Sequence, residues 1–117
     1  MYFVRLTVKP RTANIYESAN GEKPYENWLR ALKDKRAQAK IAARVDRAEI
    51  GNFGKYRELQ NGVYEIKEDF GPGYRVYFGI DGDEIILLLC GGDKGSQGRD
   101  IERAKKFWKE YNERKKL

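Results

Sequence analysis

Residues 61–78 read NGVYEIKEDFGPGYRVYF, and this stretch predicts how the chain folds. The pair Asn61–Gly62 is a two-residue hairpin signal, and the glycines around Pro72 reverse the chain a second time. Apolar and polar residues alternate between these turns, as they do in a strand with one buried face. A further turn at 81–83 leads into EIILLLC, so we predict an antiparallel meander of four strands at 56–90.

Segments with helical spacing lie on both sides of this meander. Apolar residues recur three or four positions apart at 23–34 and at 36–51, which predicts two helices joined near Asp34 and Lys35. The same spacing returns at 97–116, where the other face of the predicted helix is rich in lysine and arginine. We therefore expect a helical hairpin before the meander and one long helix after it.

The N-terminal residues complete the predicted sheet. YFVRLTV at 2–8 alternates like a strand that ends before Pro10, and the polar residues at 10–23 are expected to form a loop. The order of elements predicts an α+β fold. In this fold an antiparallel sheet, made of the N-terminal strand and the meander, carries the helical hairpin on one face and adds a C-terminal helix.

Composition limits the function classes. A chain of 117 residues is long enough for one domain, 1–117, and its +6 formal charge favours a polyanionic partner such as nucleic acid or an acidic protein. Without histidine, and with Cys90 as the single cysteine, a metal site is not expected, and no cofactor is predicted. The lone cysteine and the absence of a recognisable signal peptide favour the cytoplasm. The longest apolar run, 85–90, is too short to cross a membrane.

The second hairpin determines which side chains share a face of the sheet. If Gly71-Pro72-Gly73 is the loop, Asp69 lies opposite Arg75 and Lys67 opposite Tyr77. One face is then apolar and suited to the helices, with Tyr64, Ile66, Phe70, Tyr74, Val76 and Phe78. The other is polar, with Glu65, Lys67, Asp69, Arg75 and Tyr77.

A two-residue turn at Asn61–Gly62 adds Tyr56, opposite Lys67, to the polar face. This face has two interpretations: a solvated surface with an Asp69–Arg75 pair, or a platform that binds phosphates and bases. Three residues of the last strand, Ile86, Leu88 and Cys90, also fall on it in this register. Part of the face is therefore expected to lie under another element, such as the terminal helix.

The segment GGDKGSQGRDI at 91–101 has two interpretations as well. Glycines allow a sharp turn, and free amides at the start of the following helix favour an anion. The alternative is an ordinary turn from strand to helix, with Ser96 or a neighbour as the cap.

Three stretches together resemble one protein family. NWLRALKDKRAQAKIAARVDRAEIGNFGKYRELQNGVYEIK, GPGYRVYF and LLLCGGDKGSQGRDIERA are similar to the HigB-like addiction-module killer proteins, a branch of the RelE/ParE toxin superfamily. The resemblance covers residues 24–108. It implies a toxin of a type II toxin–antitoxin system that inhibits translation as a ribosome-dependent mRNA endonuclease (mRNA interferase).

The resemblance also implies partners. These are the ribosome with its mRNA and a helix-turn-helix (HigA-like) antitoxin, with operator DNA contacted only through the antitoxin complex and no membrane involved. ParE-like members of the superfamily inhibit DNA gyrase without cleaving RNA, which is one alternative. A basic RNA- or ribosome-binding module without cleavage is another.

Matching the motifs of RelE-type enzymes implies Lys67, Arg75 and Lys94 as site residues, and the predicted polar face adds others. The catalytic candidates are Lys67, to orient or deprotonate the RNA 2′-hydroxyl, Glu65 as the alternative base, Arg75 to bind the scissile phosphate, and Lys94 to stabilise charge or act as the acid. Glu65 stands where RelE carries a second lysine, and the base-stacking tyrosine of RelE has no clear counterpart. The RNA-binding candidates are Tyr77, Tyr56, Lys55, Arg57, Gln97 and Arg99. Cleavage through the 2′-hydroxyl needs no metal.

Overall fold

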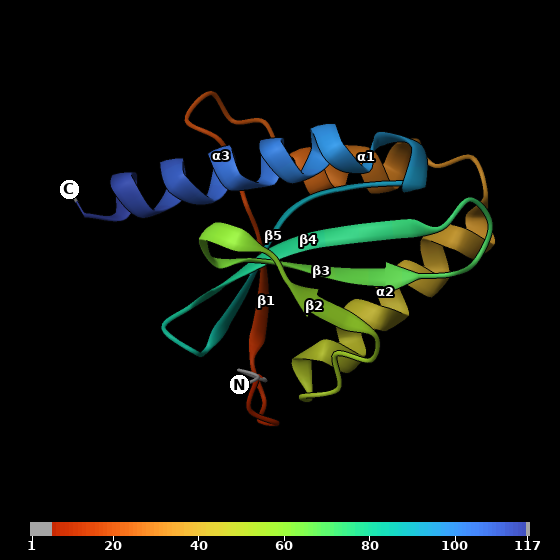
Figure 1. Ribbon diagram of the computed structural model, residues 1–117, viewed down its shortest axis with the longest axis horizontal. Helices are drawn as coiled ribbons and strands as arrows, with labels where there is room; N and C mark the ends of the chain where they lie inside the picture. Colours follow the sequence, from red (N-terminus) through yellow and green to blue (C-terminus); the bar gives the residue numbers. More distant parts are fainter. Residues whose placement is uncertain (1–5, 117) are drawn as a thin grey trace.

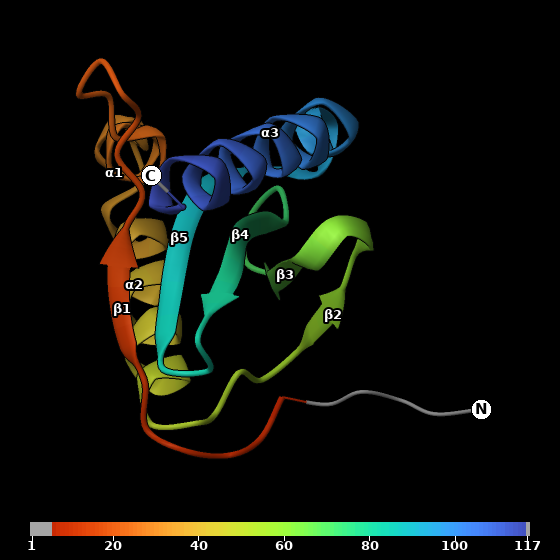
Figure 2. The same cartoon turned by 90° about the vertical axis from the view of Figure 1, so that its left-hand side faces the viewer.

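The computed structural model of the chain describes residues 6–116 and confirms the α+β class. One sheet has the strand order β1-β5-β4-β3-β2 (Figures 1 and 2). Its strands are β1 (Thr12–Ile15), β2 (Tyr56–Glu58), β3 (Val63–Glu68), β4 (Tyr74–Asp81) and β5 (Ile85–Gly92). The helices are α1 (Pro24–Ala31), α2 (Lys35–Glu49) and α3 (Gln97–Lys115), with short 3₁₀ turns η1 (Gln60–Gly62) and η2 (Lys94–Ser96). No helix within residues 6–116 is long and apolar enough to cross a bilayer.

The meander is antiparallel as predicted, but the sheet as a whole is mixed. The predicted strand at 2–8 is wrong where it can be tested, because residues 6–8 belong to no strand, while 2–5 lie outside the described residues. The first strand is instead β1, inside the predicted loop, and it runs parallel to β5 with Thr12 opposite Ile85. It is only four residues long, too short for alternation to reveal it in the sequence.

The two helices of the predicted hairpin pack on one face of the sheet (Figure 2). Pro24 stands in the first turn of α1, where its missing N–H costs nothing. Asp34 caps α2 by accepting hydrogen bonds from the amides of Arg36 (2.9 Å) and Ala37 (3.3 Å). The core between helices and sheet contains the predicted apolar face, with Ile66, Tyr74, Val76 and Phe78 buried and Tyr64 and Phe70 partly buried.

Helix α3 covers the other face of the sheet (Figure 2). Its apolar stripe closes a second core, which contains Tyr16, Val63, Tyr77, Leu87, Leu89, Cys90 and Ala104. The helix approaches closely because Gly79 has no side chain: a Cβ there would lie 2.4 Å from the ring of Trp108.

A register shift in β5 explains how its apolar residues serve both cores. Tyr77 pairs with Cys90 but Phe78 pairs with Leu88, so Leu89 is an extra residue. The shift returns Ile86 and Leu88 to the face of α1 and α2, and the prediction that they share the face of Arg75 is wrong. Cys90 does lie under the terminal helix, as expected.

Candidate functional site

The β3–β4 hairpin carries most of the candidate residues, in a register two residues from the predicted one. Lys67 lies opposite Arg75, and Glu65 lies opposite Tyr77. A shift of two leaves every side chain on its predicted face, because successive side chains of a strand alternate. The predicted Asp69–Arg75 pair does not form. The carboxylate of Asp69 instead lies 3.3 Å from the Nζ of Lys55 and 3.5 Å from that of Lys67.

The β2–β3 turn shifts its register by one residue, which does change faces. The amide of Leu59 donates to the carbonyl of Val63, and the three residues of η1 lie between them, with Asn61 at φ 65°. The connection is therefore longer than a two-residue hairpin. Tyr56 therefore pairs with Ile66, and its ring packs at 5.4 Å from that of Phe53 on the side of α2. Placing Tyr56 on the polar face was wrong. Arg57 takes that face, opposite Glu65.

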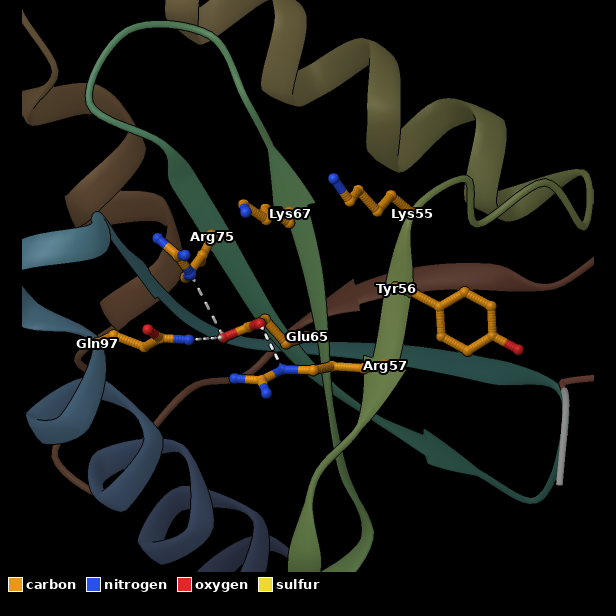
Figure 3. A pocket seen from close by; sticks show the side chains of 7 residues that line it. All are labelled: Lys55, Tyr56, Arg57, Glu65, Lys67, Arg75 and Gln97. Carbon is orange, nitrogen blue, oxygen red and sulfur yellow. Dashed lines mark hydrogen bonds and ion pairs between the residues drawn. The ribbon is translucent and has the colours of Figure 1, made fainter. Parts of the chain in front are cut away.

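Seven of the predicted site residues line one pocket of about 440 Å³ between β2, β3, β4 and the start of α3 (Figure 3). They are Lys55, Tyr56, Arg57, Glu65, Lys67, Arg75 and Gln97. Four of these side chains are cationic and only one, that of Glu65, is a carboxylate. The net positive charge of the lining favours an anionic ligand. The ring of Tyr56 points away from Glu65 (Figure 3).

Glu65 is the centre of the pocket's hydrogen-bond network and is only 2% exposed. Its Oε1 accepts from the Nε of Arg57 at 2.9 Å, and its Oε2 accepts from the Nε2 of Gln97 at 3.0 Å. The Nε of Arg75 lies 3.7 Å from the same Oε2 (Figure 3). One buried carboxylate therefore holds together side chains from β2, β4 and α3.

Arg75 lies on the predicted face but is buried there and not on an open surface. Its Nη1 donates to the carbonyl of Gly73 at 2.9 Å, whereas its Nε makes no hydrogen bond within residues 6–116. A buried guanidinium with an unused donor is costly unless a further acceptor reaches it. Because Nε itself is enclosed and faces Glu65, an oxyanion in the pocket would be bound by the Nη groups of Arg75.

Three predicted residues lie outside the pocket lining. Tyr77 is fully enclosed beneath α3, where burial, and then the charge of Glu65, raise the pKa of its hydroxyl above the ordinary value. Its prediction as an accessible stacking residue is therefore wrong, because a base could reach the ring only if α3 moved. Lys94 and Arg99 are exposed at the η2–α3 junction. Lys94 lies close to Arg75, since a Cβ on Gly73 would be within 4 Å of both side chains.

The glycines before α3 serve the turn, as one of the two interpretations predicted. The side chain of Asp93 accepts from the amides of Gly95 (2.9 Å) and Ser96 (3.2 Å), so these donors are already satisfied. A Cβ on Gly92 would lie 1.8 Å from Oδ2 of Asp100, which accepts a hydrogen bond from the hydroxyl of Ser96. This junction fixes where α3 begins, and with it the position of Gln97 in the pocket.

Most of the chain, including the pocket, is similar to known proteins. The family model described as "Phage derived protein Gp49-like" matches residues 27–109, a range that includes the whole pocket lining. An uncharacterized protein of Haemophilus influenzae is 46% identical to this chain over 81 residues. The aligned part makes up 69% of this chain and 82% of that protein.

Proposed function

We propose, because the chain belongs to the phage-derived Gp49-like family of RelE/ParE-like toxins, that it is the HigB-like toxin of a type II toxin–antitoxin system and cleaves mRNA on the ribosome. The observation that carries this proposal is the pocket in which Arg75, held beside the buried Glu65, lies together with three more cationic side chains. Such a pocket suits the phosphate of an RNA strand.

The chemistry is transfer of the phosphate to the neighbouring 2′-hydroxyl. The 2′-oxygen bonds to phosphorus as it loses its proton, and the bond from phosphorus to the 5′-oxygen breaks as that oxygen gains one. Arg75 stabilises the charge that develops on the phosphate oxygens. Lys67, which lies opposite Arg75 on the neighbouring strand β3, orients or deprotonates the 2′-hydroxyl. The exposed Lys94 donates the proton to the 5′-oxygen or supplies further positive charge.

Glu65, the alternative base suggested by its place on the face of Lys67, takes a different role in this proposal. Both of its oxygens already accept hydrogen bonds, from Arg57 and Gln97. We therefore assign it to positioning these donors and Arg75, and leave the role of base to Lys67. Because neither Tyr77 nor Tyr56 offers its ring to the pocket, we expect the RNA to be held through its phosphates and sugars, with Arg99 outside the immediate site.

Two partners accompany this function. The family's association with toxin–antitoxin systems supports a cognate antitoxin, for which we propose a small helix-turn-helix protein encoded beside this gene. The other partner is the ribosome with mRNA in its A site. Both place the protein in the cytoplasm.

The proposal is tested with purified ribosomes that carry a defined mRNA. We expect primer extension to reveal new 5′ ends in the A-site codon after addition of the protein. A parallel assay measures DNA supercoiling by gyrase. Uncut mRNA together with inhibited gyrase would replace the proposal by ParE-like activity, and binding to ribosomes without either effect would leave a binding module.

A further inference from the structure

Arg44, on α2, reaches the ends of two strands from the side of the sheet opposite the pocket. Its Nη1 donates to the main-chain carbonyl of Lys67 at 2.7 Å. Its Nη2 donates to the carbonyls of Lys55 and Phe53, both at 3.2 Å. The guanidinium, whose side chain is 11% exposed, therefore joins the chain before β2 to the end of β3.

Two of these carbonyls, those of Lys55 and Lys67, belong to residues that line the pocket. The regular β2–β3 pairing stops at Tyr56 and Ile66, and beyond it the Lys67 amide still donates to the Lys55 carbonyl at 3.1 Å. After this bond the two segments separate, one toward α2 and the other toward the β3–β4 turn. The ends of a ladder open readily unless something else holds them.

We propose that Arg44 is a positioning residue that fixes the main chain of Lys55 and Lys67, so that both ammonium groups face the same bound phosphate. The identity of that anion as RNA phosphate rests on the function proposed above. The ammonium groups of Lys55, just before β2, and Lys67, on β3, repel each other, and when a phosphate displaces Asp69 from between them a fixed main chain limits how far the two long side chains can turn apart. Holding the carbonyls from behind uses neither ammonium group, so Asp69 is the internal carboxylate that a bound phosphate has to displace from them.

The geometry requires arginine at this position. Three carbonyls on two segments are reached by two nitrogens of one planar group, whereas a lysine ammonium is a single point donor. The neighbouring Gly54 supports this arrangement, because it adopts φ +60° and a Cβ there would lie 3.0 Å from Nη2 of Arg44. Glu68 adds an ion pair at 3.4 Å, which keeps the guanidinium turned toward β3.

The test compares Arg44→Lys with Arg47→Lys, an exposed arginine one turn further along α2. Amide hydrogen exchange and the amide chemical shifts of Lys55 and Lys67 are measured during titration with inorganic pyrophosphate. In Arg44→Lys we expect the Lys67 amide to exchange about tenfold faster and pyrophosphate to bind about tenfold more weakly, as the loss of a few hydrogen bonds implies. Arg47→Lys should match the wild type in both.

The amide of Gly79, on the central strand β4 between its partners Val63 and Leu87, reports on unfolding of the whole chain. If it accelerates as much as that of Lys67, Arg44 only stabilises the fold and the inference is overturned. Unchanged pyrophosphate affinity in Arg44→Lys, or no binding by the wild type, overturns it as well. Cleavage of ribosomal mRNA is scored separately: a wild type that binds pyrophosphate through Lys55 and Lys67 but cuts no mRNA contradicts the proposed function and leaves the role of Arg44 standing.

Discussion

The Nε of Arg75 lies 3.7 Å from Oε2 of Glu65, and the two side chains are only 6% and 3% exposed. At this distance the charges attract each other, yet the Arg75 Nε is left without a hydrogen bond within the described residues. Glu65 instead accepts hydrogen bonds from Arg57 and Gln97, at 2.9 and 3.0 Å. The carboxylate thus orients Arg75 without saturating it, which leaves the guanidinium able to bind a second anion.

Replacement of Arg75 tests whether its guanidinium acts on phosphate. Arg75→Ala is expected to lower mRNA cleavage about 10²–10³-fold, as removal of a charge-stabilising donor does. Arg75→Lys should recover only part of the loss, because a point charge cannot present two parallel donors. Initial rates on ribosome-bound mRNA measure both, with thermal melts as the fold control. Arg30→Ala, on α1 and 77% exposed, is the matched arginine control, and a folded Arg75→Ala protein with wild-type rates would contradict the mechanism.

Glu65→Gln separates positioning from base catalysis. Glutamine retains the shape of the side chain but removes the charge that attracts Arg57 and Arg75, so we expect slower cleavage with a pH–rate profile of unchanged shape. If Glu65 were the base, the variant would lose the limb of the profile that reports its ionisation. The control is Glu58→Gln, an exposed glutamate on β2.

Asp69 competes with any anion for the two lysines. Asp69→Asn is expected to bind inorganic pyrophosphate several-fold more tightly than the wild type, because Lys55 and Lys67 lose their internal counter-charge. The hydrogen bond and charge of Lys55, and then those of Lys67, hold the pKa of Asp69 below its ordinary value.

A lowered pKa means that the Asp69 carboxylate stays ionised above that ordinary value and is neutralised only at still more acidic pH. The ratio of variant to wild-type affinity should therefore be constant between about pH 5 and 8. Calorimetric titrations across this range measure it. Equal affinities at every pH would show that Asp69 does not compete.

Gly92→Ala tests the close contact that sets the start of α3. A Cβ at this position would lie 1.8 Å from Oδ2 of Asp100, so the strand or the helix must shift. We expect a loss of roughly 1–3 kcal/mol or more in the free energy of unfolding, measured in urea. Gly98→Ala is the control: its Cβ would meet no atom within 4 Å, and alanine favours a helix, so stability should be equal or higher. Equal losses in both variants would contradict the assignment.

The sequence allowed much of this site to be predicted because strand alternation is robust to small errors. The hairpin around Pro72 was predicted two residues out of register, yet Glu65, Lys67 and Arg75 still fell on the correct face. The one-residue error at Asn61 moved Tyr56 to the wrong face, because the local asparagine–glycine signal does not reveal that η1 lengthens the turn.

Features that depend on distant parts of the chain were not predictable. Burial of Tyr77 follows from how closely α3 approaches the sheet, which depends on Gly79 and Trp108. The strand β1 is defined by a partner, β5, that lies far away in the sequence. Neither leaves a periodic pattern within a short window of residues.

The parallel pairing of β1 with β5 also has a consequence for the order of folding. Thr12 and Tyr16 are synthesised about 70 residues before their partners, Ile85 and the Leu88 carbonyl that accepts a hydrogen bond from the amide of Tyr16. Such non-local contacts require closure of a long loop and slow the folding of a domain. Gln97 follows later still. All four cationic residues of the pocket are therefore synthesised before the hydrogen-bond network around Glu65 can form. Assembly of the pocket is thereby delayed until the start of α3 has been synthesised.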